Sequence, residues 1–233
     1  MMRKIVNINC LLIFSLVIFS CKKVPNYVLV DKFVDSTNAG EKGKTKIVAE
    51  KFLRNDKSEC YIILNFYHKE KIIDYNTQKY YDKWYFDDRF YFDTTNIIGI
   101  DAELEDFNND GFKDFTYHSF EAARGGNEVR KLFVYNLESK RFTYIKNSEN
   151  FPNLFYNSRL DCINSLILTG STSTYFLKIK KDTLYDFANV DVSDSIFIEE
   201  RDETGKYKEI QKIKFTDSYE PFTPFINYKP LEQ

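Results

Sequence analysis

The sequence predicts an all-β protein whose antiparallel strands form a sandwich or a partial, propeller-like set of sheets. Three observations lead to this prediction. Aromatic residues make up 17% of the chain, with 22 Phe and 17 Tyr, and such side chains suit half-buried pleated surfaces. Short apolar runs alternate with polar turn signals. No long segment carries the apolar stripe of period 3.6 that an amphipathic helix would show.

The expected strands follow one another at short intervals. They span residues 46–53, 60–67, 80–93 (interrupted at Asp87 and Asp88), 97–105, 115–121, 130–135, 141–145, 165–168, 174–179, 195–200 and 207–215. Polar stretches such as 54–59 and 202–206 separate neighbouring strands and have the composition of turns. A parallel sheet would need helical crossovers, which the pattern lacks. We therefore expect sheets built from consecutive hairpins.

The first 20 residues have the composition of a secretory signal peptide. Arg3 and Lys4 give a positive start, an apolar run extends over residues 5–19, and the small residue Ser20 precedes Cys21. This run is shorter than the roughly 20 apolar residues that a membrane-spanning helix requires. The segment is therefore expected to direct export. An ordinary signal peptide, or a helical anchor with an incidental cysteine, is the simpler alternative.

The junction between Ser20 and Cys21 resembles the lipobox of bacterial lipoproteins. The resemblance implies cleavage after Ser20 and a diacylglycerol on the Cys21 thiol. Acyl chains such as palmitate would then anchor the protein. It also implies an anchor in the outer membrane or periplasm of the cell envelope, because Lys22 follows the cysteine. The expected organisation is a cleaved signal peptide (1–20), a lipidated N-terminus and tether (21–45), a single β-rich domain (46–228) and a C-terminal tail (229–233).

Two cysteines, Cys60 and Cys162, would remain in the mature chain besides Cys21. The oxidising envelope permits a disulfide between them. Two buried thiols are the alternative, because cysteine is among the most buried residue types. The sequence leaves both possibilities open.

The stretch Asp106–Asp114 predicts a calcium site. It has the sequence Asp-Phe-Asn-Asn-Asp-Gly-Phe-Lys-Asp, with oxygen-bearing side chains at positions 1, 3, 5 and 9 and a glycine at position 6. Calcium prefers six to eight oxygen ligands, and Gly111 permits the bend that would gather them. The expected ligands are the side chains of Asp106, Asn108, Asp110 and Asp114 and the backbone carbonyl of Phe112. A polar turn without metal is the alternative, and Tyr117 replaces the position-12 Glu of an EF-hand.

With a strand expected on each side, this loop resembles the calcium loop of FG-GAP and VCBS-type β proteins. The segments that follow, at 123–127, 132–136 and 140–142, are similar in order to those of small calcium-binding envelope lipoproteins. Some of those proteins are immunity proteins or inhibitors of peptidoglycan hydrolases. The resemblance covers about residues 95–215. It implies a structural Ca²⁺ ion and a protein partner in the envelope.

Residues that could carry catalysis are scarce in this sequence. His68 and His118 lie in no zinc-binding pattern, and no Gly-x-Ser-x-Gly elbow is present. A net charge of −2 gives no basic excess for nucleic acid. We therefore expect a non-enzymatic binding protein, with a cell-wall hydrolase as the partner that the resemblance implies. The alternatives are a carbohydrate-binding accessory lipoprotein that uses the aromatic segment 80–92 and, less favoured, a hydrolase.

Overall fold

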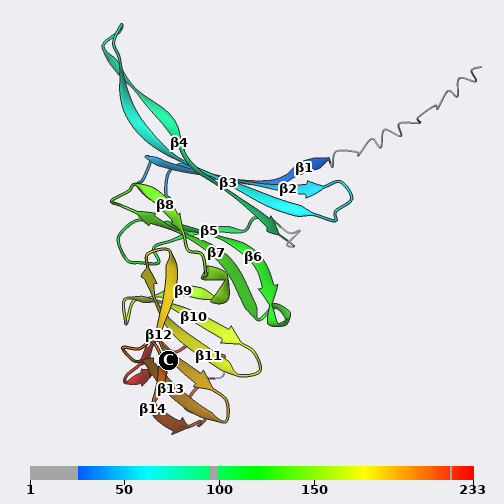
Figure 1. The fold of residues 1–233 in the computed structure, drawn as a ribbon, viewed down its shortest axis with the longest axis vertical. Coiled ribbons are helices and arrows are strands. Elements are labelled where there is room, and N and C mark those ends of the chain that lie inside the picture. The colour runs from blue at the N-terminus through cyan, green and yellow to red at the C-terminus, as the bar shows by residue number, and fades with distance from the viewer. Residues whose placement is uncertain (1–25, 95–98, 221) are drawn as a thin grey trace, which may run out of the picture.

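The computed structural model describes residues 26–94, 99–220 and 222–233, and nearly all regular structure within them is β-strand. Every pair of neighbouring strands is antiparallel, which confirms the predicted fold class (Figure 1). The expected signal peptide and Cys21 lie outside the described residues, and so does the start of the expected strand 97–105. In the described part of the chain, no helix has the length and apolar character needed to cross a bilayer.

Three sheets follow one another along the chain. The first contains β1 (Tyr27–Asp35), β2 (Thr45–Arg54), β3 (Cys60–Asp74) and β4 (Lys79–Thr94). The second contains β5 (Ala102–Glu105), β6 (Asp114–Ala122), β7 (Asn127–Asn136) and β8 (Arg141–Tyr144). The third contains β9 (Leu154–Asn157), β10 (Cys162–Leu168), β11 (Thr172–Lys180), β12 (Thr183–Val192), β13 (Ser195–Arg201) and β14 (Tyr207–Lys214).

Shorter elements complete the molecule. These are the 3-10 turns η1 (Ala123–Gly125) and η2 (Ser148–Asn150), and the two-stranded pair β15 (Asn227–Tyr228) and β16 (Leu231–Glu232). In each large sheet the strands lie in chain order, as expected for strands that are joined by hairpins. The three sheets are stacked along the long axis of the molecule (Figure 1).

Strand β7 of the second sheet is buried on both faces. One face packs against the first sheet and the other against the third sheet. Successive side chains of a strand point to opposite faces. Phe133 and Tyr135 accordingly pack in a cluster with Phe66 of the first sheet, whereas Leu132 and Val134 pack with residues of β10, β11 and β12. The far face of the third sheet is covered by the C-terminal segment around Phe225. The near-continuous apolar run in the sequence of β7 is therefore typical of a strand that is buried on both faces.

Ordered structure begins earlier and ends later than the sequence predicted. Strand β1 lies inside the segment expected to be a tether, and it pairs with β2 from Tyr27 to Asp35. Among the described residues of that segment, 36–44 form a loop between β1 and β2. At the other end, Leu231 pairs with Tyr228 and Arg159 bonds the carboxylate of Glu232, so the expected tail is held to the third sheet. Both ends gain backbone or ionic partners that single-sequence patterns do not reveal.

Two β-bulges alter the first sheet. The register of β1 against β2 shifts between Leu29 and Asp31, which leaves Val30 as an extra residue. In β4 the partners of Phe66 and Tyr67 are Asp88 and Phe86, so the extra residue is Asp87. The acidic pair that was expected to divide this segment therefore marks a bulge inside one continuous strand. A bulge re-aims side chains and increases the local twist.

Candidate functional site

The predicted calcium loop connects β5 to β6, and its polar side chains converge on its own backbone. The backbone N–H of Asp110 donates to Oδ1 of Asp106 at 3.1 Å and to Oδ1 of Asn108 at 3.3 Å. The amide of Asn108 donates to Oδ2 of Asp110 at 2.9 Å. Gly111, with φ +87°, donates to Asp106 at 2.8 Å, so the glycine supplies the left-handed bend that the sequence required.

Asp114 plays a different part from the other three predicted side-chain ligands. It is fully buried, and its two carboxylate oxygens accept the backbone N–H groups of Phe107 at 2.9 Å and of Tyr135 at 2.8 Å. Burial raises the pKa of Asp114 to about 8, although both hydrogen bonds act in the opposite direction. Asp114 therefore fastens the end of the loop to β7.

The side-chain oxygens of the loop are the ligands that a hard cation prefers. In the present conformation these oxygens accept hydrogen bonds from the backbone and side chains of the loop. In the residues that the structure describes, no three His, Cys, Asp or Glu side chains are gathered so as to hold a metal ion. Asp106, Asn108 and Asp110 lie together toward solvent, and each carboxylate oxygen retains a second lone pair. The ring of Phe112 packs against Tyr135 and the core, which leaves only its backbone carbonyl for a metal. These residues fit Ca²⁺ chemically, with Asp114 as the buried brace.

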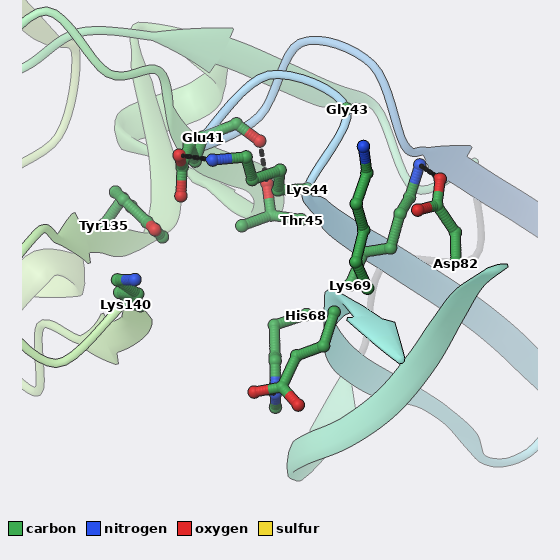
Figure 2. Close-up of a pocket in the computed structure, with 11 residues that line it drawn as sticks. Glu41, Gly43, Lys44, Thr45, His68, Lys69, Asp82, Tyr135 and Lys140 are labelled. Carbon is green, nitrogen blue, oxygen red and sulfur yellow. Dashed lines mark hydrogen bonds and ion pairs between the residues drawn. The ribbon is translucent and has the colours of Figure 1, made fainter. Parts of the chain in front are cut away.

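A hollow of about 430 Å³ lies where the first sheet meets the second (Figure 2). The loop 41–45, residues 68–71 of β3 and Asp82 of β4 form one side, and Tyr135 and Lys140 form the other. Its lysines and carboxylates are mixed: Lys44 pairs with Glu41, and Lys69 lies 3.7 Å from Asp82. The lining thus carries no strong excess of either charge.

His68 lies between two carboxylates in this hollow. Its Nδ1 lies 2.5 Å from Oδ1 of Asp87, a nearly buried carboxylate, and its Nε2 lies 3.4 Å from Oε1 of Glu70. The bulge at Asp87 turns this side chain toward the histidine, which is why the sequence pattern did not pair them. A His–Asp pair is half of a general-base device. Thr45, which pairs with His68 on the neighbouring strand, also lines the hollow. Its hydroxyl donates to the backbone carbonyl of Ala39.

Tyr135 closes the hollow on the side of the second sheet. Its hydroxyl is buried without a hydrogen-bond partner among the described residues. Its ring lies against Gly40, where a Cβ atom would come within 2.7 Å of the ring carbon Cδ2. Gly40 also has φ +55°, so both the conformation and the space at this position favour glycine.

The aromatic segment of β4 divides between core and surface. Phe90 and Phe92 pack on the core between the first two sheets. Tyr91, on the opposite face, stacks on Tyr61 with ring centroids 4.9 Å apart. Tyr61, Tyr91 and Tyr27 line a second hollow together with Glu59 and Asp93. The imperfect alternation of the sequence thus reflects aromatic rings on both faces of one sheet.

The hairpin of β3 and β4 extends well beyond its neighbours. Strand β2 pairs with β3 only as far as His68, whereas β3 and β4 continue to pair with each other from Lys69 and Trp84 to Asp74 and Lys79. We call residues 69–84 the arm; it projects from the body of the molecule (Figure 1). Tyr75, Tyr80 and Tyr81 of the arm are 81%, 71% and 50% exposed.

No disulfide joins Cys60 and Cys162. Cys60 lies in β3 of the first sheet and Cys162 in β10 of the third, with the second sheet between them. Both side chains are buried. Burial raises the pKa of the Cys162 thiol to about 11 and also raises that of Cys60. Of the two possibilities that the sequence left open, the structure therefore has two buried thiols.

No protein-family model matches the chain, and no curated protein matches it. One solved structure, described as "Structure of a Xanthomonas Type IV Secretion System related protein", is similar over 81% of this chain and 100% of its own. The two share 12% sequence identity with a TM-score of 0.43. A likeness of this degree supports no statement about the family or function of this chain.

Proposed function

We propose that this protein is a lipid-anchored, calcium-stabilised binding protein of the bacterial cell envelope, and that its arm holds a protein partner. The lipid anchor at Cys21 comes from the sequence alone. The calcium ion would be held by Asp106, Asn108, Asp110 and the carbonyl of Phe112, with Asp114 as the buried brace of the loop, and would act as a structural clip. The partner that the sequence resemblance suggests is a cell-wall hydrolase, whose activity the protein would inhibit.

The observation that carries this proposal is the arm. A two-stranded hairpin by itself is only marginally stable in water, and usually needs a third strand or a packed face. In the described residues the arm contacts the body only near its base, where the N–H of Lys69 donates to the carbonyl of Lys44 and Lys46 lies over the Trp84 ring. Beyond the base its two strands pair only with each other and display Tyr75, Tyr80 and Tyr81. Tyrosine is enriched among the residues that dominate protein–protein binding. An exposed aromatic arm is therefore well suited to gain its missing packing from a partner.

Capture of a partner from the envelope tests the proposal. The double variant Tyr80→Thr with Tyr81→Thr keeps β-forming residues in the arm and removes both rings. The intact protein should retain a stoichiometric protein from detergent-solubilised envelope, and the double variant should retain at least tenfold less. Phe222→Ala, which removes an aromatic ring that is 67% exposed in the C-terminal segment, is the matched control and should bind normally. Equal capture by the double variant would refute the role of the arm.

The identity of the partner as a hydrolase has its own test. The purified lipoprotein, added to a captured peptidoglycan hydrolase, should slow the release of soluble peptidoglycan fragments. Turnover of peptidoglycan by the protein alone would instead make it a hydrolase, with the His68–Asp87 pair as the first place to look. Binding without any change in the rate would support a binding role and remove the inhibitory one.

A carbohydrate-binding role is the second candidate, and one observation favours it. Rings of Tyr27, Tyr61 and Tyr91 and the carboxylates of Glu59 and Asp93 line the same hollow. Aromatic faces with nearby hydrogen-bonding groups suit a ligand that has both apolar and polar faces, as a sugar has. Retention on a glycan array that Tyr91→Ala abolishes would support this role. Capture of a protein partner with no glycan retention would exclude it.

A further inference from the structure

The start of β1 displays three consecutive apolar side chains at the edge of the first sheet. Val28, Leu29 and Val30 are 48%, 50% and 45% exposed. In a regular strand the side chains alternate between faces, so a covered face usually hides every second residue. Here the bulge at Val30 breaks the alternation, and in the described part of the chain no strand pairs with the outer edge of β1. A continuous apolar edge of this kind requires a cover.

A further β-strand is a poor cover for this edge. The bulge at Val30 interrupts the ladder of N–H and C=O groups that an added strand would use. Just beyond it, the carboxylate of Asp31 accepts the backbone N–H of Ile100 at 2.7 Å, so residues 99 and 100 already occupy the neighbouring position. A second copy of this chain, or an extended peptide, could therefore pair with very few residues of β1.

The distance along the chain to the proposed lipid anchor argues for a different cover. Tyr27 follows Cys21 by six residues, and an extended chain spans at most about 3.6 Å per residue. The start of β1 therefore cannot lie more than about 22 Å from an acylated Cys21. Lys22 and Lys23 fall within this short connection and would favour anionic headgroups. An acylated Cys21 would thus keep the apolar edge of β1 within about 22 Å of the membrane that holds the lipid.

We propose that Val28, Leu29 and Val30 insert into the interfacial layer of the membrane that carries Cys21, so that the first sheet stands on the bilayer by this end. The inference rests on the proposed lipid anchor. Tyr27, whose hydroxyl bonds the Glu59 carboxylate, would lie at the level of the headgroups, where tyrosine is enriched.

This orientation has a consequence for the arm. Tyr27 pairs with Arg54, and the adjacent Leu53 pairs with Cys60, the first residue of β3. The tip of the arm is at the opposite end of that strand, after Asp74. At about 3.3 Å per residue, the 15 residues of β3 span about 50 Å. A sheet that stands on the membrane by the start of β1 would hold its tyrosines far from the bilayer, where a partner can reach them.

Spin labels test the proposed contact. The full lipoprotein is produced in its acylated form, with one added cysteine, and reconstituted into vesicles of phosphatidylethanolamine and phosphatidylglycerol. A nitroxide is placed at Leu29→Cys, at Val34→Cys, which is 52% exposed further along β1, or at Ile210→Cys, which is 36% exposed on β14. Cys60 and Cys162 are buried, and the protein without an added cysteine reports any background labelling. Power saturation compares collisions with oxygen, which enters lipid, and with a water-soluble nickel chelate.

The label at position 29 should show an oxygen-to-nickel collision ratio at least threefold above that at position 210, with position 34 between them. Equal ratios at 29 and 210, in a protein that floats with the vesicles and has an acylated Cys21 by mass spectrometry, would overturn the contact and leave the anchor intact. Ratios at 34 that match those at 29 would overturn the upright orientation. A protein that neither floats nor carries a lipid would overturn the anchor and the inference together.

Discussion

Asp114 accepts the backbone N–H of Tyr135 at 2.8 Å, and this bond ties the predicted calcium loop to the central strand of the molecule. The other carboxylate oxygen accepts the N–H of Phe107, inside the loop. One buried side chain therefore holds the conformation of the loop and its position on β7. Any change in the loop, including the binding of a cation, is mechanically linked to the core between the first two sheets.

Replacement of Asp114 by Asn should destabilise the protein even without calcium. An amide has one oxygen, so its NH₂ group must face one of the two N–H donors and leave that donor unsatisfied. A buried donor without a partner costs about 1–3 kcal/mol. Urea unfolding in the presence of a chelator should show this loss for Asp114→Asn. Asp217→Asn, which alters an exposed carboxylate, should unfold like the unmodified protein. Equal stability of both variants would show that the brace contributes nothing.

Calcium should stabilise the protein through the exposed part of the loop. At a concentration tenfold above Kd, a ligand that binds only the folded state adds about 1.4 kcal/mol, and extracellular calcium modules bind with Kd of about 10⁻⁴–10⁻³ M. Thermal unfolding with millimolar Ca²⁺ should therefore give a higher Tm than unfolding with chelator. Asp110→Ala should lower the Tm in calcium and abolish the difference, while Asp217→Ala should preserve it. Identical melting curves with calcium and chelator would exclude the site.

The sequence located most strands, including β4, β6 and β14, although each of these contains a bulge, but it missed β1 and β12. The predicted segment 60–67 begins where β3 begins, and 115–121 falls within β6. The missed strand β12 shifts register against Phe176 and Leu177, which makes Phe187 an extra residue and breaks the alternation. In the missed strand β1 the extra residue is Val30. A bulge moves side chains between faces, and a period-2 pattern cannot represent this.

The candidate sites show the same division. The loop at Asp106–Asp114 was visible because all its polar residues are close in sequence. The pairing of His68 with Asp87 depends on the alignment of two strands and on a bulge, so no local pattern could reveal it. The arm was equally hidden, because its exposure depends on where β2 ends. The loop was therefore recognisable from local sequence, and the features that arise from tertiary structure were not.

The carboxylate of Asp35 should make stability depend on pH in acid. Burial alone would raise the pKa of Asp35. Its carboxylate, however, accepts hydrogen bonds from the Asn38 side chain and from the backbone N–H groups of Ala39, Asn38 and Thr37. These bonds favour the charged form more than burial disfavours it, so the pKa is lowered. A lowered pKa in the folded state contributes stability that is present above the unfolded value, about 3.9. It is lost as the pH falls through the folded value.

Comparison of the unmodified protein with Asp35→Asn isolates this effect. The variant should be less stable by about 1–2 kcal/mol at pH 7, because the charged acceptor is lost. The difference between the two proteins should remain constant down to about pH 5 and shrink below about pH 4. Urea unfolding at several pH values measures it. A difference that stays unchanged from pH 7 to pH 3 would show that the Asp35 charge does not stabilise the loop.

Replacement of Gly40 by Ala should be more damaging than replacement of Gly43. Both glycines have positive φ, +55° and +70°, so alanine pays a similar backbone cost of about 1 kcal/mol at each. At Gly40 the new Cβ would also meet Cδ2 of Tyr135 at 2.7 Å, whereas nothing lies within 4 Å at Gly43. Overpacking typically costs a further 1–3 kcal/mol. Equal losses of stability for the two variants would mean that the Tyr135 ring moves aside without cost.

The two buried thiols should react only when the protein unfolds. The thiolate is the reactive form, and burial both blocks access and raises the pKa of Cys162 to about 11. With Cys21 acylated, a maleimide should therefore modify neither Cys60 nor Cys162 at pH 7 in buffer, and both in denaturant without a reducing agent. Mass spectrometry of the intact protein counts the added groups. Two groups added only after reduction would reveal a disulfide. Such a bond would require the first and third sheets to meet, which the second sheet between them prevents.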